Sequence, residues 1–224
     1  MAVKTEDKRR RILSAALDCF EKKGFAAASM DDIARDARVA KGTIYNYFKG
    51  KDELLEALAE NIAGVMRRNL ESMMQPENAG LSLKEKLMKI VAPLADGTPR
   101  SRHNVRIFRL VWAEGLRSPK LTHDLYARLF LPIFTRDGLL PRLLENEDVP
   151  AFVRERPVVI AAPLIQAIFI QAVVDNELIG NPREYIEGYF NFILSKGAVE
   201  GTEAEMPPTA GMTDASSRNS SKCI

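Results

Sequence analysis

The residues whose types and spacing suggest a particular chemistry lie close together near the N-terminus. Residues 29–49 have the pattern of a short helix, a tight turn and a second short helix, and residues 41–43, Lys-Gly-Thr, begin the second helix. Small side chains there let a helix enter the DNA major groove, about 12 Å wide, while its N–H groups and dipole attract phosphate. Tyr45, Asn46 and Tyr47 follow, and their hydroxyl and amide groups can bond to base edges or phosphates. This stretch therefore favours the binding of double-stranded DNA.

Residue types that serve catalysis or metal binding lack the necessary spacing. The sequence contains no Gly-x-Ser-x-Gly, no Gly-Lys-Ser/Thr phosphate loop and no His-Glu-x-x-His. His103 and His123 have no further ligands at metal-binding spacing, and Cys19 lies in an apolar helical pattern while Cys223 lies in a polar stretch. We therefore expect no enzyme, no metal, no cofactor and no disulfide.

The net charge of +2 is unevenly distributed along the 224 residues. Through Lys51, twelve basic residues accompany seven acidic ones, a net charge of +5, so the remainder carries −3. A basic surface that binds a polyanion is therefore expected in the N-terminal quarter.

Two segments bear on the location of the protein. The first eleven residues are charged and lack the apolar stretch of a signal peptide. Residues 158–174 carry no charge and reach the minimum length of a membrane span, about 17 residues. Pro163, Gln166 and Gln171 interrupt this segment, so we expect a buried helix, a cytoplasmic protein and no membrane partner.

Apolar residues recur at helical spacing through most of the chain, and no alternating strand pattern appears. Thr5 and Asp52 are expected to cap helices, and Ser29 with Asp32 forms a start similar to a capping box. An all-α fold follows, with helices expected over residues 5–23, 29–37, 40–49, 52–70, 81–94, 103–116, 120–137, 139–144, 157–179 and 183–196.

Within residues 11–58 a series of residue types occurs in a fixed order: Ile12-Leu13, Ala15-Ala16, Phe20, Gly24-Phe25, Ser29, Asp32-Ile33-Ala34, Ala37, Val39, Lys41-Gly42-Thr43-Ile44-Tyr45, Tyr47-Phe48 and Lys51-Asp52-Glu53-Leu54-Leu55. In this order the segment resembles the DNA-binding domain of the tetracycline-repressor (TetR) family of bacterial transcription regulators. The resemblance implies a three-helix helix-turn-helix domain in residues 1–51 and a helical ligand-binding and dimerisation domain in residues 52–197. Residues 198–224 have the composition of a disordered tail.

The resemblance also assigns roles to single residues. Ser29 would contact a phosphate, and Tyr47 and Lys51 would hold the DNA backbone. The residues that would enter the major groove are Lys41, Gly42, Thr43 and Tyr45. Asn46 and Lys49 lie beside these DNA-contacting residues. This sequence departs from the family's pattern at two positions. The family usually has Gly where Arg38 stands and a capping Ser or Thr where Ala40 stands. We expect backbone strain at Arg38 if its φ is positive, a phosphate contact from its side chain, and an uncapped helix after Ala40.

The C-terminal region resembles the family in layout only. Aromatic residues are expected to line an apolar ligand pocket, namely Phe108, Trp112, Phe134 and Phe169. Excess apolar surface on the last two helices predicts a homodimer interface formed by Ile160, Leu164, Ile168, Val173, Tyr189, Phe190 and Ile193.

Three functions stay open at this point. The first is a repressor that a small apolar effector releases from an inverted-repeat operator. The second is a DNA-binding activator or architectural protein without an effector, and the third is a helical enzyme or lipid-binding module. An enzyme would need ionisable residues converging in its pocket, whereas a regulator needs mainly an apolar one.

Overall fold

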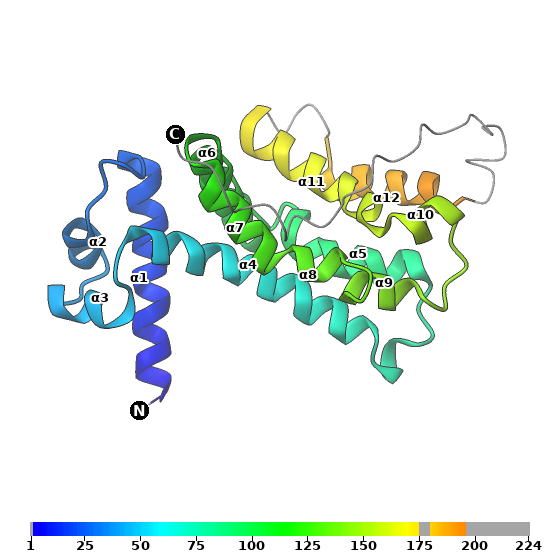
Figure 1. Cartoon of the computed structure of the whole chain (residues 1–224), viewed down its shortest axis with the longest axis horizontal. Coiled ribbons are helices and arrows are strands. Elements are labelled where there is room, and N and C mark those ends of the chain that lie inside the picture. The colour runs from blue at the N-terminus through cyan, green and yellow to red at the C-terminus, as the bar shows by residue number, and fades with distance from the viewer. Residues whose placement is uncertain (1, 175–179, 196–224) are drawn as a thin grey trace, which may run out of the picture.

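Helices make up almost the whole of the described part of the chain, residues 2–174 and 180–195 of a computed structural model, and that part contains no strand (Figure 1). The all-α fold predicted from the sequence is therefore confirmed.

Three helices gather at the N-terminal end: α1 (Ala2–Lys23), α2 (Met30–Asp36) and α3 (Lys41–Tyr47). Gly24 ends α1 with a φ of 79°, a left-handed conformation that favours glycine. Phe20, Ile33 and Ile44, one from each helix, are buried together. The expected cap at Thr5 is wrong, because α1 begins at Ala2 and Thr5 lies inside it.

A long helix, α4 (Lys51–Met73), runs from these three helices along the rest of the molecule (Figure 1). Its buried side chains recur at helical spacing, from Leu55 through Ile62 to Leu70. They contact α1 at one end and α5, α6, α7 and α9 further along. Gly50, rather than Asp52, is the N-cap, and Asp52 lies in the first turn, where its carboxylate still faces the positive end of the helix dipole.

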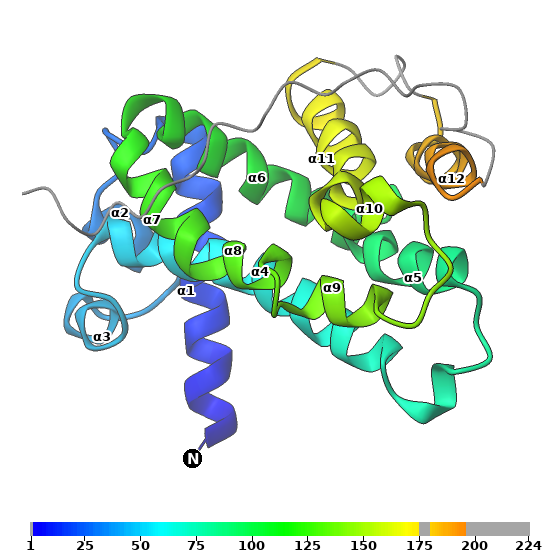
Figure 2. The ribbon, with the colours of Figure 1, turned by 45° about the vertical axis from the view of Figure 1, so that its right-hand side comes forward.

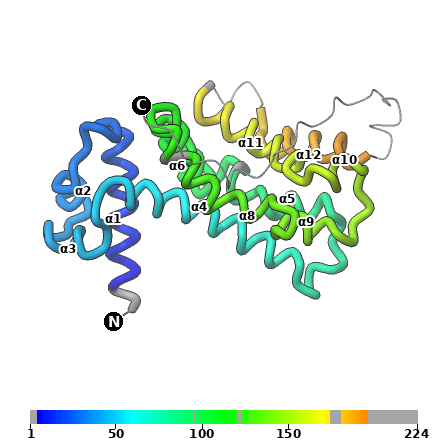
Figure 3. Tube along the Cα trace, in the orientation of Figure 1, coloured from blue at the N-terminus to red at the C-terminus, as the bar shows by residue number. Residues whose placement is uncertain are grey.

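The C-terminal region stacks shorter elements on α4 (Figures 2 and 3). They are η1 (Pro76–Asn78), α5 (Leu83–Ala95), α6 (Pro99–Arg117), α7 (Pro119–Leu129), α8 (Leu131–Phe134), α9 (Leu139–Leu144), α10 (Ala151–Glu155), η2 (Pro157–Ala161), α11 (Ala162–Phe169), η3 (Ile170–Val174) and α12 (Pro182–Ile193).

Two of the longer predicted helices are interrupted. The helix expected over residues 120–137 breaks at Phe130, because Pro132 has no N–H to continue the ladder and its ring clashes with the preceding turn. The helix expected over residues 157–179 is a 3-10 turn, then α11, then the π-helical turn η3, and residues 175–179 lie outside the described part.

No helix in the described ranges combines the length and apolar character that a bilayer crossing requires. The uncharged stretch of residues 158–174 instead lies partly in the core, where Ile160, Leu164 and Ile168 are buried. The tail predicted for residues 198–224 lies outside the described residues, and the division into domains at residues 51 and 52 stays a prediction.

Candidate DNA interface and ligand pocket

The exposed face of α3 is open to a partner. Ala40, the N-cap, has extended backbone (φ −66°, ψ 148°) and makes no side-chain capping bond, as expected. Lys41 and Gly42 are exposed, and a Cβ placed on Gly42 would meet no atom within 4 Å. Ile44 and Phe48 are buried and anchor the opposite face of α3 on its neighbours. The start of α3 can therefore approach another surface closely without clashing with its own domain.

The polar side chains of α3 differ in how far they are already engaged. Tyr45 is 45% exposed and Asn46 is exposed, whereas Thr43 is half-buried. Tyr47 is also half-buried, and its hydroxyl donates a hydrogen bond of 3.3 Å to the carbonyl of Thr5. Lys41 lies 2.8 Å from the carboxylate of Asp31 in an exposed ion pair. Tyr45 and Asn46 therefore offer exposed polar groups on this helix, whereas the exposed ammonium group of Lys41 is already paired with Asp31.

Ser29 caps α2 in a network with Asp32. The Ser29 Oγ accepts from the Asp32 N–H at 3.1 Å and donates to Asp32 Oδ2 at 2.8 Å. Lys23 and Arg35 pair with the same carboxylate at 2.9 and 2.6 Å. The ammonium of Lys23, the hydroxyl of Ser29 and the guanidinium of Arg35 hold the pKa of Asp32 well below its usual range. This cluster fixes the start of α2 beside the end of α1.

Arg38, in the turn between α2 and α3, has a φ of 55° and is the one non-glycine residue with a positive φ in the described ranges. The strain expected from a side chain at this position is therefore present, at a cost of about 1–2 kcal/mol. Its side chain is exposed and available to a phosphate.

The two lysines that end the N-terminal domain behave differently. Lys49 is exposed, and its backbone N–H donates to Glu53 Oε2 at 2.7 Å, while its ammonium group makes no ion pair or hydrogen bond with the described residues. Lys51 is half-buried: its Nζ donates to the carbonyls of Phe25 at 2.7 Å and Ala26 at 2.9 Å and lies 5.1 Å from the Phe25 ring centroid. The ammonium group of Lys51 thus fastens the loop between α1 and α2 to α4, and its expected contact with the DNA backbone stays a prediction.

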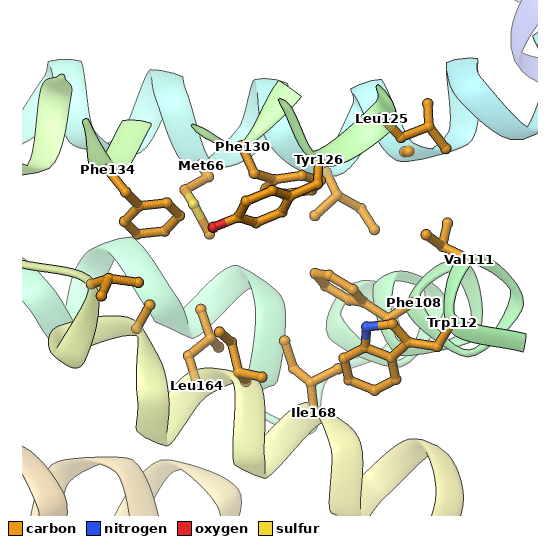
Figure 4. Close-up of a pocket in the computed structure, with 15 residues that line it drawn as sticks. Met66, Phe108, Val111, Trp112, Leu125, Tyr126, Phe130, Phe134, Leu164 and Ile168 are labelled. Atoms are coloured by element: carbon orange, nitrogen blue, oxygen red, sulfur yellow. The ribbon is translucent and has the colours of Figure 1, made fainter. Parts of the chain in front are cut away.

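A largely apolar pocket of about 160 Å³ lies between α4, α6, α7, α8 and α11 (Figure 4). Its lining residues are Ala59, Ile62, Met66, Phe108, Val111, Trp112, Leu125, Tyr126, Phe130, Phe134, Val158, Ala161, Leu164, Ile165 and Ile168. The structure thus brings together three of the four predicted pocket residues, Phe108, Trp112 and Phe134.

Phe169, the fourth, is not among the lining residues. It is 47% exposed, and its ring lies 5.7 Å from that of Trp112, so it supports Trp112 from outside the pocket. Tyr126, which was not predicted from the sequence, lines the pocket four residues before Phe130 and eight before Phe134. This spacing of four residues was the available signal, because it places the three rings on one side of the chain segment.

Most of the predicted dimer-interface residues are buried within a single chain. Ile160, Leu164, Ile168, Phe190 and Ile193 are each at most 4% exposed and belong to the core. A side chain already covered by its own chain has little surface left for a partner, and the interface predicted from the sequence stays a prediction. Of the other two residues of the predicted interface, Val173 is 57% exposed and Tyr189 is half-buried.

A group of charged residues that the sequence analysis did not identify joins the helix-turn-helix domain to the pocket. Arg106 of α6 donates from Nε to Glu21 of α1 at 2.9 and 3.0 Å, and its Nη2 pairs with both Glu21 and Asp18. These carboxylates raise the pKa of Arg106, whereas burial and the neighbouring guanidinium lower the pKa of His103. Phe108, two residues further along α6, lines the pocket, so α6 links the pocket to α1 directly.

In the described ranges, no three or more His, Cys, Asp or Glu side chains gather as a metal site would require. The geometry instead defines a helix-turn-helix protein: three N-terminal helices present α3, and a helical domain with an apolar pocket follows.

Comparison with known proteins agrees with this class. Residues 12–58 match the family model described as bacterial regulatory proteins of the tetR family. The chain is 32% identical over 114 residues to the HTH-type transcriptional regulator BetI of Klebsiella pneumoniae (strain 342), a match covering 51% of this chain and 58% of BetI. The matches to the first curated relatives span between a third and three fifths of their lengths. The N-terminal domain is therefore a tetR-family domain, which confirms the resemblance seen in the sequence.

Solved structures extend the likeness to the whole fold. A structure titled as a putative TetR-family transcriptional regulator from Rhodococcus sp. superposes with a TM-score of 0.65 at 18% identity, covering 85% of this chain and all of that one. Thermus thermophilus FadR, titled as a TetR-family transcriptional repressor in complex with lauroyl-CoA, superposes with a TM-score of 0.55 at 21% identity, covering 89% and 98%. These likenesses show the fold.

Proposed function

We propose that the protein is a sequence-specific DNA-binding transcriptional regulator, a repressor that a small apolar ligand releases from its operator. The proposal rests on one chain combining an exposed helix α3, in a tetR-family domain, with an apolar pocket in the helical region that follows. The DNA-binding role implies a cytoplasmic location.

In this proposal α3 enters the major groove. Lys41, Tyr45 and Asn46 reach base edges, while the small side chains of Gly42 and Thr43 let the start of the helix approach. Ser29, Arg38, Tyr47 and Lys49 contact the DNA backbone. Lys51 acts as a positioning residue, because its ammonium group holds the loop between α1 and α2.

We also propose that two copies bind together, through apolar side chains that remain exposed on α11, η3 and α12. Ile165, Phe169 and Val173 are 51%, 47% and 57% exposed and are spaced four residues apart. Phe192 of α12 is 64% exposed, and α11 and α12 pack on each other at the outer edge of the molecule (Figures 1 and 2). A two-fold pairing of these helices forms a four-helix bundle.

The dimer has a direct test. The Phe169→Glu variant should sediment as a monomer at micromolar concentration while the wild type sediments as a dimer. Leu116→Glu, which alters a residue that is 88% exposed on α6, is the matched control and should leave the dimer intact. Equal sedimentation of wild type and Phe169→Glu would contradict this interface.

Ligand release requires that the pocket and α3 be coupled. Two routes connect them: α4, which lines the pocket with Ile62 and Met66 and begins next to α3, and the contact of Arg106 with α1. The ligand must bind better to the conformation that binds the operator poorly, and a tenfold loss of operator affinity needs about 1.4 kcal/mol of difference. By the same linkage, operator DNA must weaken the ligand by the same factor.

An enzyme is the weaker candidate, because the fifteen lining residues include no Asp, Glu, His, Lys, Arg, Cys or Ser to act as acid, base or nucleophile. An activator or an architectural protein shares the DNA interface, but an architectural protein would bind without sequence preference.

The test of the proposed function is binding to duplexes that the protein enriches from a random pool, compared with a scrambled duplex. Tyr45→Ala and Lys41→Ala should reduce the preference for the enriched duplex, with about 1–3 kcal/mol of discrimination lost for each base contact removed. Lys120→Ala, which removes an exposed lysine on α7, is the matched control and should bind as the wild type does. Unchanged sequence preference in Tyr45→Ala would contradict the role given to α3.

A further inference from the structure

The pocket is lined without a single charge. Its fifteen residues are aliphatic, aromatic or Met, and Tyr126 supplies the one hydroxyl group. Placing an unpaired ion among such side chains is strongly unfavourable, because the ion loses its hydration and gains no counter-charge. The lining therefore selects against carboxylates, phosphates and ammonium groups.

Aromatic rings line two sides of the cavity. Phe108 and Trp112 of α6 form one pair, with centroids 5.7 Å apart, and Tyr126 and Phe130 form the other, with centroids 6.3 Å apart and planes 18° from parallel. Figure 4 shows the second pair and Phe134 across the cavity from the α6 pair. Ring centroids prefer to be about 4.5–7 Å apart, so a further flat ring would find partners on both sides.

Two polar atoms interrupt the apolar lining. The Trp112 Nε1–H is a donor only, and Figure 4 shows it on the edge of the indole that faces the cavity. In the described part of the chain it donates to no protein acceptor, and the Tyr126 hydroxyl likewise makes no hydrogen bond there. Both groups can satisfy an oxygen acceptor on a ligand.

The volume limits the size of the ligand. A cavity of about 150 Å³ with an apolar lining is known to hold benzene, and the pocket here is about 160 Å³. A ligand of one or two rings fits without rearrangement, whereas a drug-sized molecule would need the pocket to enlarge.

We infer that the effector is an uncharged aromatic molecule of one or two rings with one hydrogen-bond acceptor, which Trp112 Nε1–H binds. The inference rests on the proposed function and specifies the ligand class of its pocket. An acyl-CoA such as the one named for the Thermus thermophilus structure does not suit this lining, because the phosphates of CoA would find no basic side chain in it.

Four one-ring probes test the inference on the full chain by calorimetry: acetophenone, ethylbenzene, benzoate and benzyltrimethylammonium. Acetophenone should bind about 3- to 10-fold more tightly than ethylbenzene, since one hydrogen bond separates them. Both charged probes should bind at least about 30-fold more weakly than acetophenone. Trp112 is the one tryptophan of the sequence, so its fluorescence reports occupancy independently.

Trp112→Phe keeps a ring but removes the donor, so the preference for acetophenone over ethylbenzene should disappear while ethylbenzene binding is kept. Should that variant fail to fold, Val158→Glu places a carboxylate at the partly exposed edge of the pocket and should shift binding toward benzyltrimethylammonium. Leu116→Glu, which adds the same charge outside the pocket, should bind all four probes as the wild type does.

Benzoate or benzyltrimethylammonium binding as tightly as acetophenone would overturn the inference, and so would the absence of binding by all four probes at millimolar concentration. Binding to the enriched duplex is measured in parallel. If the duplex is bound selectively while the probes fail, the ligand class alone is wrong. If acetophenone binds as expected while no duplex is preferred, the proposed function fails.

Discussion

Lys51 provides a sharp test of how the helix-turn-helix domain is held together. Its ammonium group donates to two loop carbonyls, at 2.7 and 2.9 Å, while its stem and charge lie against the Phe25 ring. A hydrogen bond to a charged group contributes about 1.5–3 kcal/mol, and partial exposure of this site reduces the sum of the two bonds to about 2 kcal/mol. The Lys51→Met variant, which keeps the stem and loses the ammonium group, should therefore unfold about 4–8 °C lower.

Thermal unfolding followed by circular dichroism measures this loss, and the salt dependence of DNA binding identifies its cause. Lys49→Met is the matched control: Lys49 is exposed, so its stability should change by less than about 0.5 kcal/mol. If Lys49 contacts phosphate, its loss reduces the slope of log K against log salt concentration by about one, whereas the slope for Lys51→Met should stay that of the wild type. An unchanged melting temperature in Lys51→Met together with a reduced slope would refute the positioning role.

Three further substitutions probe other features. Arg106→Gln should lower the free energy of unfolding by about 1 kcal/mol, since its ion pairs are partly exposed, and should reduce the effect of a bound probe on operator affinity. Arg100→Gln on the same helix is the control and should do neither. Equal coupling in both variants would exclude the contact of Arg106 with α1 as a route between the pocket and α3. The folded-state pKa of Asp32 is lowered, so its ion pairs stabilise the fold above the ordinary Asp pKa of about 3.9 and lose that effect as pH falls. The difference in melting temperature between wild type and Asp32→Asn should therefore shrink below about pH 4. A difference that does not vary with pH would contradict this. Arg38→Gly should raise stability by about 1 kcal/mol through relief of the left-handed strain, and a lower melting temperature would show that the turn gains more from the side chain than it loses.

The N-terminal domain was predictable in detail because its signals are local. Ser29 caps α2 through the residue three positions on, and the turn at Arg38 follows from the spacing of two short helices. The positive φ of Arg38 and the missing cap at Ala40 could be expected from single departures in an otherwise continuous pattern. Such features depend on neighbours within a few residues, which the sequence displays directly.

The C-terminal region was less predictable because its contacts are distant in sequence. Apolar spacing indicates that Ile168 and Phe190 are buried, but it does not distinguish burial in the same chain from burial against a partner. The pairing of Arg106 with Glu21 spans 85 residues and leaves no local pattern. The pocket residues Phe108 and Trp112 were expected. Phe169 was expected to line the pocket too, but it contacts Trp112 without lining the cavity, and only the packing of α11 on α6 decides this.

If two copies of α3 bind one DNA sequence, selection from a pool of random duplexes should enrich an inverted repeat. Its half-sites should be centred about 34–36 Å apart or a multiple of that distance, one half-site for each α3. Enrichment of a site without dyad symmetry, or no enrichment over a scrambled duplex, would contradict it.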